Sequence, residues 1–258
     1  VSSLSVSGTL PELGAGAGFL QISAKNLTAA NRVIPDLGLV MEGSRADHQI
    51  TWQMAAGPVA AEGILHGALD NDFNWQGESQ AGTVNVGDFS WQLTAPFAVN
   101  WQQLAKHITL APHCWLAEQA QLCSLDNLEA SPQAAHAHFD LSKLEISRLS
   151  AVFPEGLAWQ GALQGNVEMN WQVNQPPELK LELITDNGAI GLSRDDDEPL
   201  TLPYHQLRLA ANTEADHQIK FHFDMKAPNM GQGYIEARIK PDEKPYPIKG
   251  EKKKKKVN

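Results

Sequence analysis

Histidines and carboxylates are the side chains that could do acid–base or metal chemistry here: nine histidines and 30 acidic residues occur among 258. Catalysis would need a nucleophile beside a base, or several metal ligands at fixed spacing. No G-x-S-x-G elbow, H-E-x-x-H pair or G-x-x-x-x-G-K-[ST] loop occurs. Five histidines occupy mostly polar positions of alternating segments, and we expect them to face solvent: His48, His136, His138, His217 and His222. We therefore expect no enzymatic activity, no cofactor and no metal.

The two cysteines, Cys114 and Cys123, are separated by eight residues. This spacing suits a short hairpin closed by a disulfide, and the alternative is two free thiols. His113 beside Cys114 could suggest zinc, but no second cluster of ligands accompanies them. A disulfide would place the chain in an oxidising compartment, such as the periplasm or the cell exterior.

The charge of the chain bears on its partners. The net charge is −10, although the run Lys252–Lys256 is basic, so the rest of the chain is more acidic still. An acidic body argues against binding to nucleic-acid phosphates. No apolar run approaches the roughly 18 residues of a membrane span, and no secretory signal is visible. Because the sequence starts at Val1, we expect a piece of a longer protein whose anchor lies outside it.

Alternation of apolar and polar residues dominates the sequence. It is clearest at residues 218–225, where every second residue is apolar. Successive side chains of a strand point to opposite faces, so this pattern predicts strands with one apolar and one polar face. Similar short strands are expected along most of the chain, with turns at residues 70–72 and 174–177. The fold class is therefore all-β, with many short antiparallel strands.

Three local features refine this prediction. Residues 141–152 have apolar side chains at mostly helical spacing and precede Pro154, which predicts one short helix. Asn187-Gly188 is a hairpin signal, and residues 159–164 and 167–173 read as separate strands. The acidic run Asp195–Glu198 is expected to be a solvated loop.

The chain divides into three expected segments: residues 1–110, a strand repeat; residues 111–250, with the cysteine loop and the helix; and residues 251–258, a lysine-rich tail that is non-native or disordered. Residues 46–54 resemble residues 215–225, and residues 65–77 resemble residues 163–173. The spacing of these matches is not constant, which excludes a strict solenoid.

The apolar faces carry the functional interpretation. In a closed sandwich they would bury each other, whereas in an open curved sheet they would line a trough for a ligand or partner. Periodicity alone does not separate the two. The candidate lining residues are Ile50, Trp52, Met54, Val167, Met169, Trp171, Leu181, Leu183, Ile219, Phe221, Phe223 and Met225.

Several motifs occur in an order that resembles the TamB family. They are HCWLAEQAQLC at residues 113–123, HAHFDLSKLEISRLSAVFP at 136–154, GALQGNVEMNW at 161–171 and LTLPYHQLRLAANTEADHQIKFHF at 200–223. The resemblance is clearest over residues 110–250. It implies an elongated β-taco, a folded sheet with a hydrophobic groove along its length. It also implies a periplasmic location and an anchor, outside this sequence, in the inner membrane of a Gram-negative bacterium.

The resemblance implies a function as well. TamB-like proteins are expected to pass phospholipids from the inner to the outer membrane and to pair with TamA, an outer-membrane barrel. The acyl chains would lie on the apolar faces, and the TamA-type barrel would be bound by a region outside this sequence. The alternative is a chaperone for outer-membrane β-barrel proteins and autotransporters, adding client strands to a sheet edge. A third possibility is a sandwich-type scaffold without a ligand.

Overall fold

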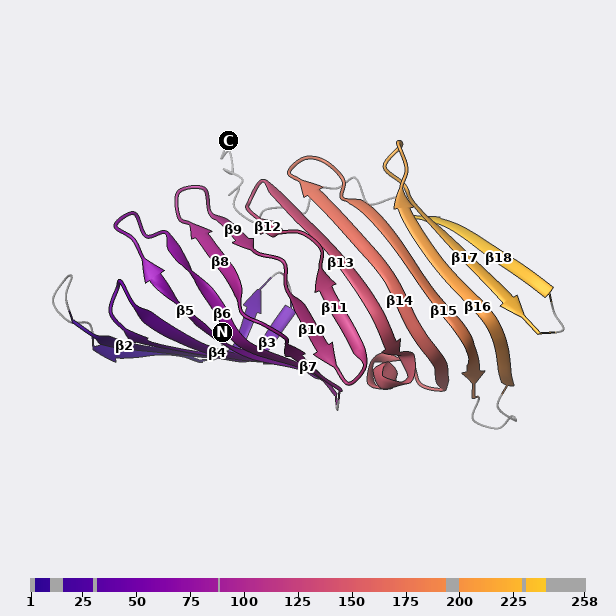
Figure 1. Cartoon of the computed structure of the whole chain (residues 1–258), viewed down its shortest axis with the longest axis horizontal. Helices are drawn as coiled ribbons and strands as arrows, with labels where there is room; N and C mark the ends of the chain where they lie inside the picture. The colour runs from indigo at the N-terminus through magenta and orange to yellow at the C-terminus, as the bar shows by residue number, and fades with distance from the viewer. Residues whose placement is uncertain are drawn as a thin grey trace, which may run out of the picture.

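A single antiparallel sheet accounts for nearly all of the structure, a computed structural model that describes residues 3–9, 16–29, 32–87, 89–193, 200–228 and 231–239. Figure 1 shows the strands side by side in a curved sheet whose long axis runs across them. Each crossing of the sheet, whether one long strand or two short collinear ones, is called a rung here. Within the described residues β1 pairs only with β2 and β18 only with β17, so the sheet has two free edges.

The first six rungs form a meander in which each strand pairs with the next in sequence. Their residues alternate between apolar and polar, which is the pattern of a sheet with two unlike faces. The strands are β1 (Ser3–Thr9), β2 (Gly18–Ala29), β3 (Arg32–Gly43), β4 (His48–Ala56), β5 (Val59–Leu69) and β6 (Trp75–Val86).

The next three rungs are each interrupted near their middle. The breaks fall at residues 94–96, 111–113 and 125–127, side by side across the sheet, and two of them contain a proline. Proline cannot donate a ladder hydrogen bond, which favours a break at these positions. The three rungs are β7 (Phe89–Leu93) with β8 (Phe97–Gln102), β9 (His107–Leu110) with β10 (Cys114–Ala117), and β11 (Ala120–Ser124) with β12 (Leu128–Ala130).

The last six rungs are continuous and mostly long. Each again pairs with its neighbour in sequence. The elements are β13 (Ala134–Glu145), the 3-10 helix η1 (Ile146–Val152), β14 (Leu157–Gln172), β15 (Glu178–Leu192), β16 (Leu200–Thr213), β17 (Ile219–Ala227) and β18 (Gly231–Ile239).

The all-β prediction is confirmed, with differences in detail. The short helix expected over residues 141–152 is present as η1, but residues 141–145 continue β13 because Leu144 pairs with Leu163 beyond a bulge. Residues 159–164 and 167–173 lie in the single strand β14, apart from Val173, which follows it. The expected turns at 70–72 and 174–177 lie between strands. The sheet is continuous across the expected boundary after residue 110, whereas residues 195–198 and 251–258 lie outside the described residues.

The hairpin predicted at Asn187-Gly188 is wrong. These residues lie inside β15, where Asn187 has φ 51° and the register against β14 slips by one residue. Asn tolerates this left-handed conformation, which a bulge needs as much as a hairpin turn does. The bulge makes room for Tyr204 of β16, because a Cβ on Gly188 would overlap the tyrosine ring. The Tyr204 hydroxyl donates to the Gln160 carbonyl at 2.7 Å and accepts from Trp159 Nε1 at 2.9 Å.

One face of the sheet is apolar from edge to edge. Directly paired residues of neighbouring strands share a face, so the pairs can be followed across the sheet. The line that starts at Leu4 crosses every rung and meets apolar side chains or glycine throughout: Ala24, Leu37, Met54, Ala61, Val84, Trp91, Leu93, Trp115, Leu122, Leu141, Gly165, Leu183, Leu209, Phe223 and Ile235. We call this side the apolar face and the other side the polar face.

Burial on the apolar face is high in the middle of the sheet and also at Leu207 and Ala211 of β16. In the middle, buried side chains form a hydrophobic core cluster that we call the mid-sheet cluster: Phe89, Trp91, Ala117, Ala120 and Leu144. Leu149 of η1 packs against it, so the short helix covers this part of the face. Over β4, β15 and β17 the apolar face is only partly buried.

Candidate functional site

The twelve residues predicted to line a trough all lie on the apolar face. Met54, Leu183 and Phe223 lie on the line of pairs described above, and the other nine lie an even number of residues from it along the same strands, hence on the same face. Met169 is 41% exposed and the other eleven are partly exposed. The sequence thus identified the face, and the structure shows that these positions remain accessible rather than sealed in a core.

Part of this face is formed by aromatic rings that lie over glycines of neighbouring strands. A Cβ on Gly63 would come within 2.9 Å of the Trp52 ring, and a Cβ on Gly82 within 2.7 Å of the Trp115 ring. Since real Cβ atoms do not approach so closely, glycine is what lets each ring lie flat against the sheet. A flat ring adds apolar surface without raising the floor of the trough.

His48 is an exception to the expectation for histidines. It lies on the apolar face, 5% exposed, because β4 begins at this residue and its even-numbered residues face that side. Its Nε2 accepts a hydrogen bond from Trp75 Nε1 at 2.8 Å, and its Nδ1 is 3.0 Å from the Ser44 carbonyl. Both contacts are satisfied by the neutral ring with the proton on Nδ1. His48 is therefore a structural residue, and its prediction as solvent-facing is wrong.

The polar face carries a chain of partly buried charges across β12 to β14. Asp126 accepts from His136 Nε2 at 3.0 Å, and its other oxygen lies 3.3 Å from His138 Nδ1. His136 also contacts Asn170 Oδ1 at 2.6 Å through Nδ1. The hydrogen bond to Asn170, and next the one to Asp126, raise the pKa of His136, because both ring nitrogens must carry protons to make them.

The pKa of Asp126 moves in the opposite direction. Desolvation alone would raise it, but the hydrogen bonds from His136 and His138 outweigh that cost and lower it. The hydrogen bond from Lys180 likewise lowers the pKa of Glu168. The network ties the loop between β11 and β12 to the continuous strands beside it.

The polar side of β17 is also partly covered. His222 lies 2.8 Å from Asp224 and 3.2 Å from Glu236, and its ring stacks on Tyr234. His222 therefore faces the side opposite Phe221, as the alternation predicts, but ion pairs partly shield it from solvent. His136 and His138 are partly buried in the same way, whereas His217 is exposed.

Cys114 and Cys123 form a disulfide, as expected from their spacing. They are directly opposite on β10 and β11, with 4.0 Å between their Cα atoms. Cys123 pairs with Asp140 on the other side, which places the disulfide on the polar face behind the mid-sheet cluster. The bond fastens two short strands whose ladder the breaks would otherwise weaken.

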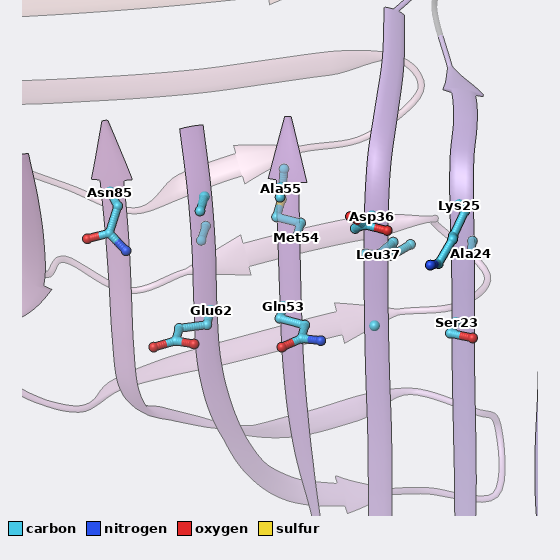
Figure 2. A pocket seen from close by; sticks show the side chains of 13 residues that line it. Ser23, Ala24, Lys25, Asp36, Leu37, Gln53, Met54, Ala55, Glu62 and Asn85 are labelled. Atoms are coloured by element: carbon cyan, nitrogen blue, oxygen red, sulfur yellow. The ribbon is translucent and has the colours of Figure 1, made fainter. Parts of the chain in front are cut away.

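A hollow of about 490 Å³ lies over β2 to β6. In Figure 2 the polar side chains of Ser23, Gln53 and Glu62 lie in a row across neighbouring strands, as their pairing requires. Met54, one of the predicted lining residues, also borders this hollow, together with Asp36. The hollow holds no nucleophile–base pair.

Sequence reasoning missed the residues that close the middle of the sheet. Phe89 and Trp91 alternate with polar residues much as Phe221 and Phe223 do, so the pattern gave no reason to separate them. Tyr204 was missed because its burial depends on glycines of two other strands. Within the described ranges no group of three or more potential ligands could hold a metal ion. No helix of the described part is long and apolar enough to cross a membrane.

The fold and the site together define a class: an elongated all-β protein, built as one antiparallel meander, whose sheet presents a largely uncovered apolar face. The chain matches the family model described as TamB, N-terminal domain, over residues 1–258. It therefore belongs to the TamB family, a family of transport and assembly proteins. No solved structure matches the chain.

Proposed function

We propose that this chain is a periplasmic segment of a TamB-like bridge that carries phospholipids from the inner to the outer membrane along the apolar face. The observation that carries the proposal is the unbroken line of apolar residues across every rung, partly exposed over β4, β14, β15 and β17. Soluble proteins rarely leave so extended an apolar surface without something to cover it. Acyl chains fit this face because they are apolar and form no hydrogen bonds.

The surroundings of the face support the same proposal. The polar face carries the ion pairs of His136 with Asp126 and of His222 with Asp224 and suits contact with the aqueous periplasm, and the disulfide suits an oxidising compartment. A TamA-type outer-membrane barrel is the expected partner, bound through a region outside this sequence. The family membership supports this pairing without locating it.

Two opposite side chains of β17 give the test. Phe221→Arg places a guanidinium on the apolar face, where it repels alkyl chains but can reach water along the open trough. We expect a folded protein with at least a tenfold loss of lipid photocrosslinking. His222→Arg keeps a cation beside Asp224 and Glu236, so near-normal crosslinking is expected. Circular dichroism melts verify folding.

The outcomes separate the alternatives. Equal lipid crosslinking by both variants would rule out this strand as part of a lipid path. Unfolding of Phe221→Arg alone would point to a closed core and to the scaffold interpretation.

The free edge at β18 favours a second candidate function, a chaperone that accepts strands of outer-membrane β-barrel proteins and autotransporters. Every residue of β18 is exposed, and its pairing in the described residues is with β17 alone. A client strand would add to this edge through backbone hydrogen bonds. Ile235→Pro would remove a backbone donor there. Loss of client-peptide binding with unchanged lipid crosslinking at Phe221 would support this second function.

A further inference from the structure

A small hollow lies at the edge of the sheet where the turn between β10 and β11 meets the end of β13 and η1. Figure 1 shows η1 at the lower edge of the sheet, beside the ends of these strands. The hollow has a volume of about 180 Å³. Its lining combines apolar side chains of the mid-sheet cluster with polar and charged residues: Phe89, Ala117 and Ala120 with Gln119, Glu118, Lys143, Glu145 and Arg148.

The apolar part of the lining is continuous with the trough. Phe89 is 5% exposed and Ala117 and Ala120 are 2% exposed, and all three belong to the mid-sheet cluster. They lie on the apolar face through the pairs Val86↔Phe89 and Ala117↔Ala120. The hollow is thus a place where the apolar face reaches the charged edge of the sheet.

The charged part contains two cations and two anions. Arg148 and Glu118 pair with each other at 2.7 Å. Lys143 and Glu145 have no ion-pair partner within the parts of the chain that the structure describes. Glu145 flanks the start of η1, yet its side chain makes no capping hydrogen bond there. One ammonium and one carboxylate are therefore available at the hollow.

The backbone at this edge is strained. Glu118 and Lys143 have φ 54° each, a left-handed conformation that side chains other than Gly, Asn and Asp rarely adopt. Such conformations cost free energy and cluster at binding sites. Here Glu118 flanks the hollow from the turn between β10 and β11, and Lys143 flanks it from β13, so both left-handed residues lie at the same hollow.

We propose that this hollow binds the headgroup of a zwitterionic phospholipid, which carries a phosphate and an ammonium group. Lys143, with Arg148 beside it, holds the phosphate, and Glu145, with Glu118, holds the ammonium group. The first part of the acyl chains meets the small exposed part of Phe89 and its neighbours at the hollow. The inference rests on the proposed lipid function and adds to it a headgroup preference and a binding site midway along the sheet.

The balance of charge distinguishes this ligand from related ones. A purely anionic headgroup would satisfy Lys143 but would leave Glu145 facing like charge. Inorganic phosphate would use the cations and leave the apolar lining in water. A zwitterionic phospholipid alone satisfies the cation, the anion and the apolar surface together.

Native mass spectrometry of this chain, loaded from equal mixtures of phosphatidylethanolamine and phosphatidylglycerol, tests the inference. We expect the unmodified chain to retain phosphatidylethanolamine in excess. Glu145→Lys should shift the ratio at least tenfold towards phosphatidylglycerol, and Lys143→Glu should lower phosphatidylethanolamine occupancy by a similar factor. Lys226→Glu changes the net charge as Lys143→Glu does, far along the chain on β17, and should leave the ratio unchanged. Circular dichroism verifies that each variant folds.

Each remaining outcome contradicts part of the scheme. If both variants keep the original lipid ratio while Phe221 still crosslinks lipid, the headgroup site is wrong and the lipid path stands. If the unmodified chain retains neither lipid, the proposed function fails and the headgroup site with it. If inorganic phosphate or glycerophosphoethanolamine displaces the lipid at equal concentration, the apolar lining contributes nothing and the inference is overturned.

Discussion

The mid-sheet cluster and the apolar side of β17 are built from the same alternation of residues, yet the cluster is buried and the apolar side chains Ile219, Phe221, Phe223 and Met225 stay partly exposed. Phe89 is 5% exposed, whereas Phe221 is only partly buried. The middle differs in having three interrupted rungs and η1, whose Leu149 packs on the cluster. Between Phe89 and Phe221 the difference in exposure therefore lies in what covers each ring, not in the alternation of the strand.

Truncation of matched phenylalanines should separate the two parts most clearly. Phe89→Ala removes a fully packed ring and should cost about 3–5 kcal/mol of the free energy of unfolding. Phe221→Ala should cost about 1–2 kcal/mol, because part of that ring is already in water. Urea denaturation of both variants measures the difference. Equal losses would mean that the two parts do not differ in packing.

Reduction of the disulfide should weaken the middle of the sheet by the next largest amount. In the chain-entropy picture a loop of this length contributes roughly 2–3 kcal/mol. Because Cys114 and Cys123 fasten β10 to β11, hydrogen exchange should accelerate there and remain unchanged in β16 and β17. Mass spectrometry with and without reductant makes the comparison. Uniform acceleration along the chain would show that the sheet unfolds as one unit.

Tyr204→Phe examines a tightly packed point of β16, outside the mid-sheet cluster. The change removes a hydroxyl that bonds Gln160 and Trp159 at a residue only 2% exposed. Leaving the part-buried Trp159 Nε1 and Gln160 carbonyl without this partner should cost about 1–2 kcal/mol. Thermal melts measure the loss, and Tyr234→Phe, at an exposed tyrosine of β18, is the control. No loss would mean that packing of the Tyr204 ring against Gly161 and Gly188, without the hydrogen bonds of its hydroxyl, is enough to fix the bulge.

The smallest effect is expected at His136, which joins the interrupted rungs to β14. The hydrogen bonds to Asn170 and Asp126 raise the pKa of His136 above its ordinary value of 6.5. Its contribution to the free energy of unfolding is therefore complete below pH 6.5 and is lost as the pH rises through the raised pKa. The contribution should be at most about 1 kcal/mol, as for partly exposed ion pairs. Melts from pH 6 to 9 should show a narrowing gap between the unmodified chain and His136→Gln. His205→Gln is the control, and a constant gap would contradict this assignment.

Much of the apolar face followed from the sequence because alternation reports which side of a strand each residue faces. All twelve candidate residues lie together for that reason. Alternation does not report what covers the face, since this depends on η1 and on the breaks at residues 94–96, 111–113 and 125–127. The alternation pattern therefore could not predict whether the apolar face is open or closed.

The Asn187-Gly188 signal gave a wrong prediction because a hairpin turn and a β-bulge need the same backbone conformation. Asn187 adopts φ 51° in a bulge, and a hairpin turn would have used the same residue in the same way. Which one forms is decided by Tyr204, a residue 17 positions away that fills the space over Gly188. His48 was misassigned because the start of β4, not the residue type, sets its face.

The order of pairing has a consequence for how this chain acquires its structure. Each described rung pairs only with rungs adjacent to it in sequence, so the contacts are local for an all-β protein. Local contacts lower the entropy that must be lost before pairing begins and speed folding. Each new hairpin can add to the free edge of the part already formed. The first strands can therefore pair while later residues are still unfolded, and folding does not have to wait for the final strand.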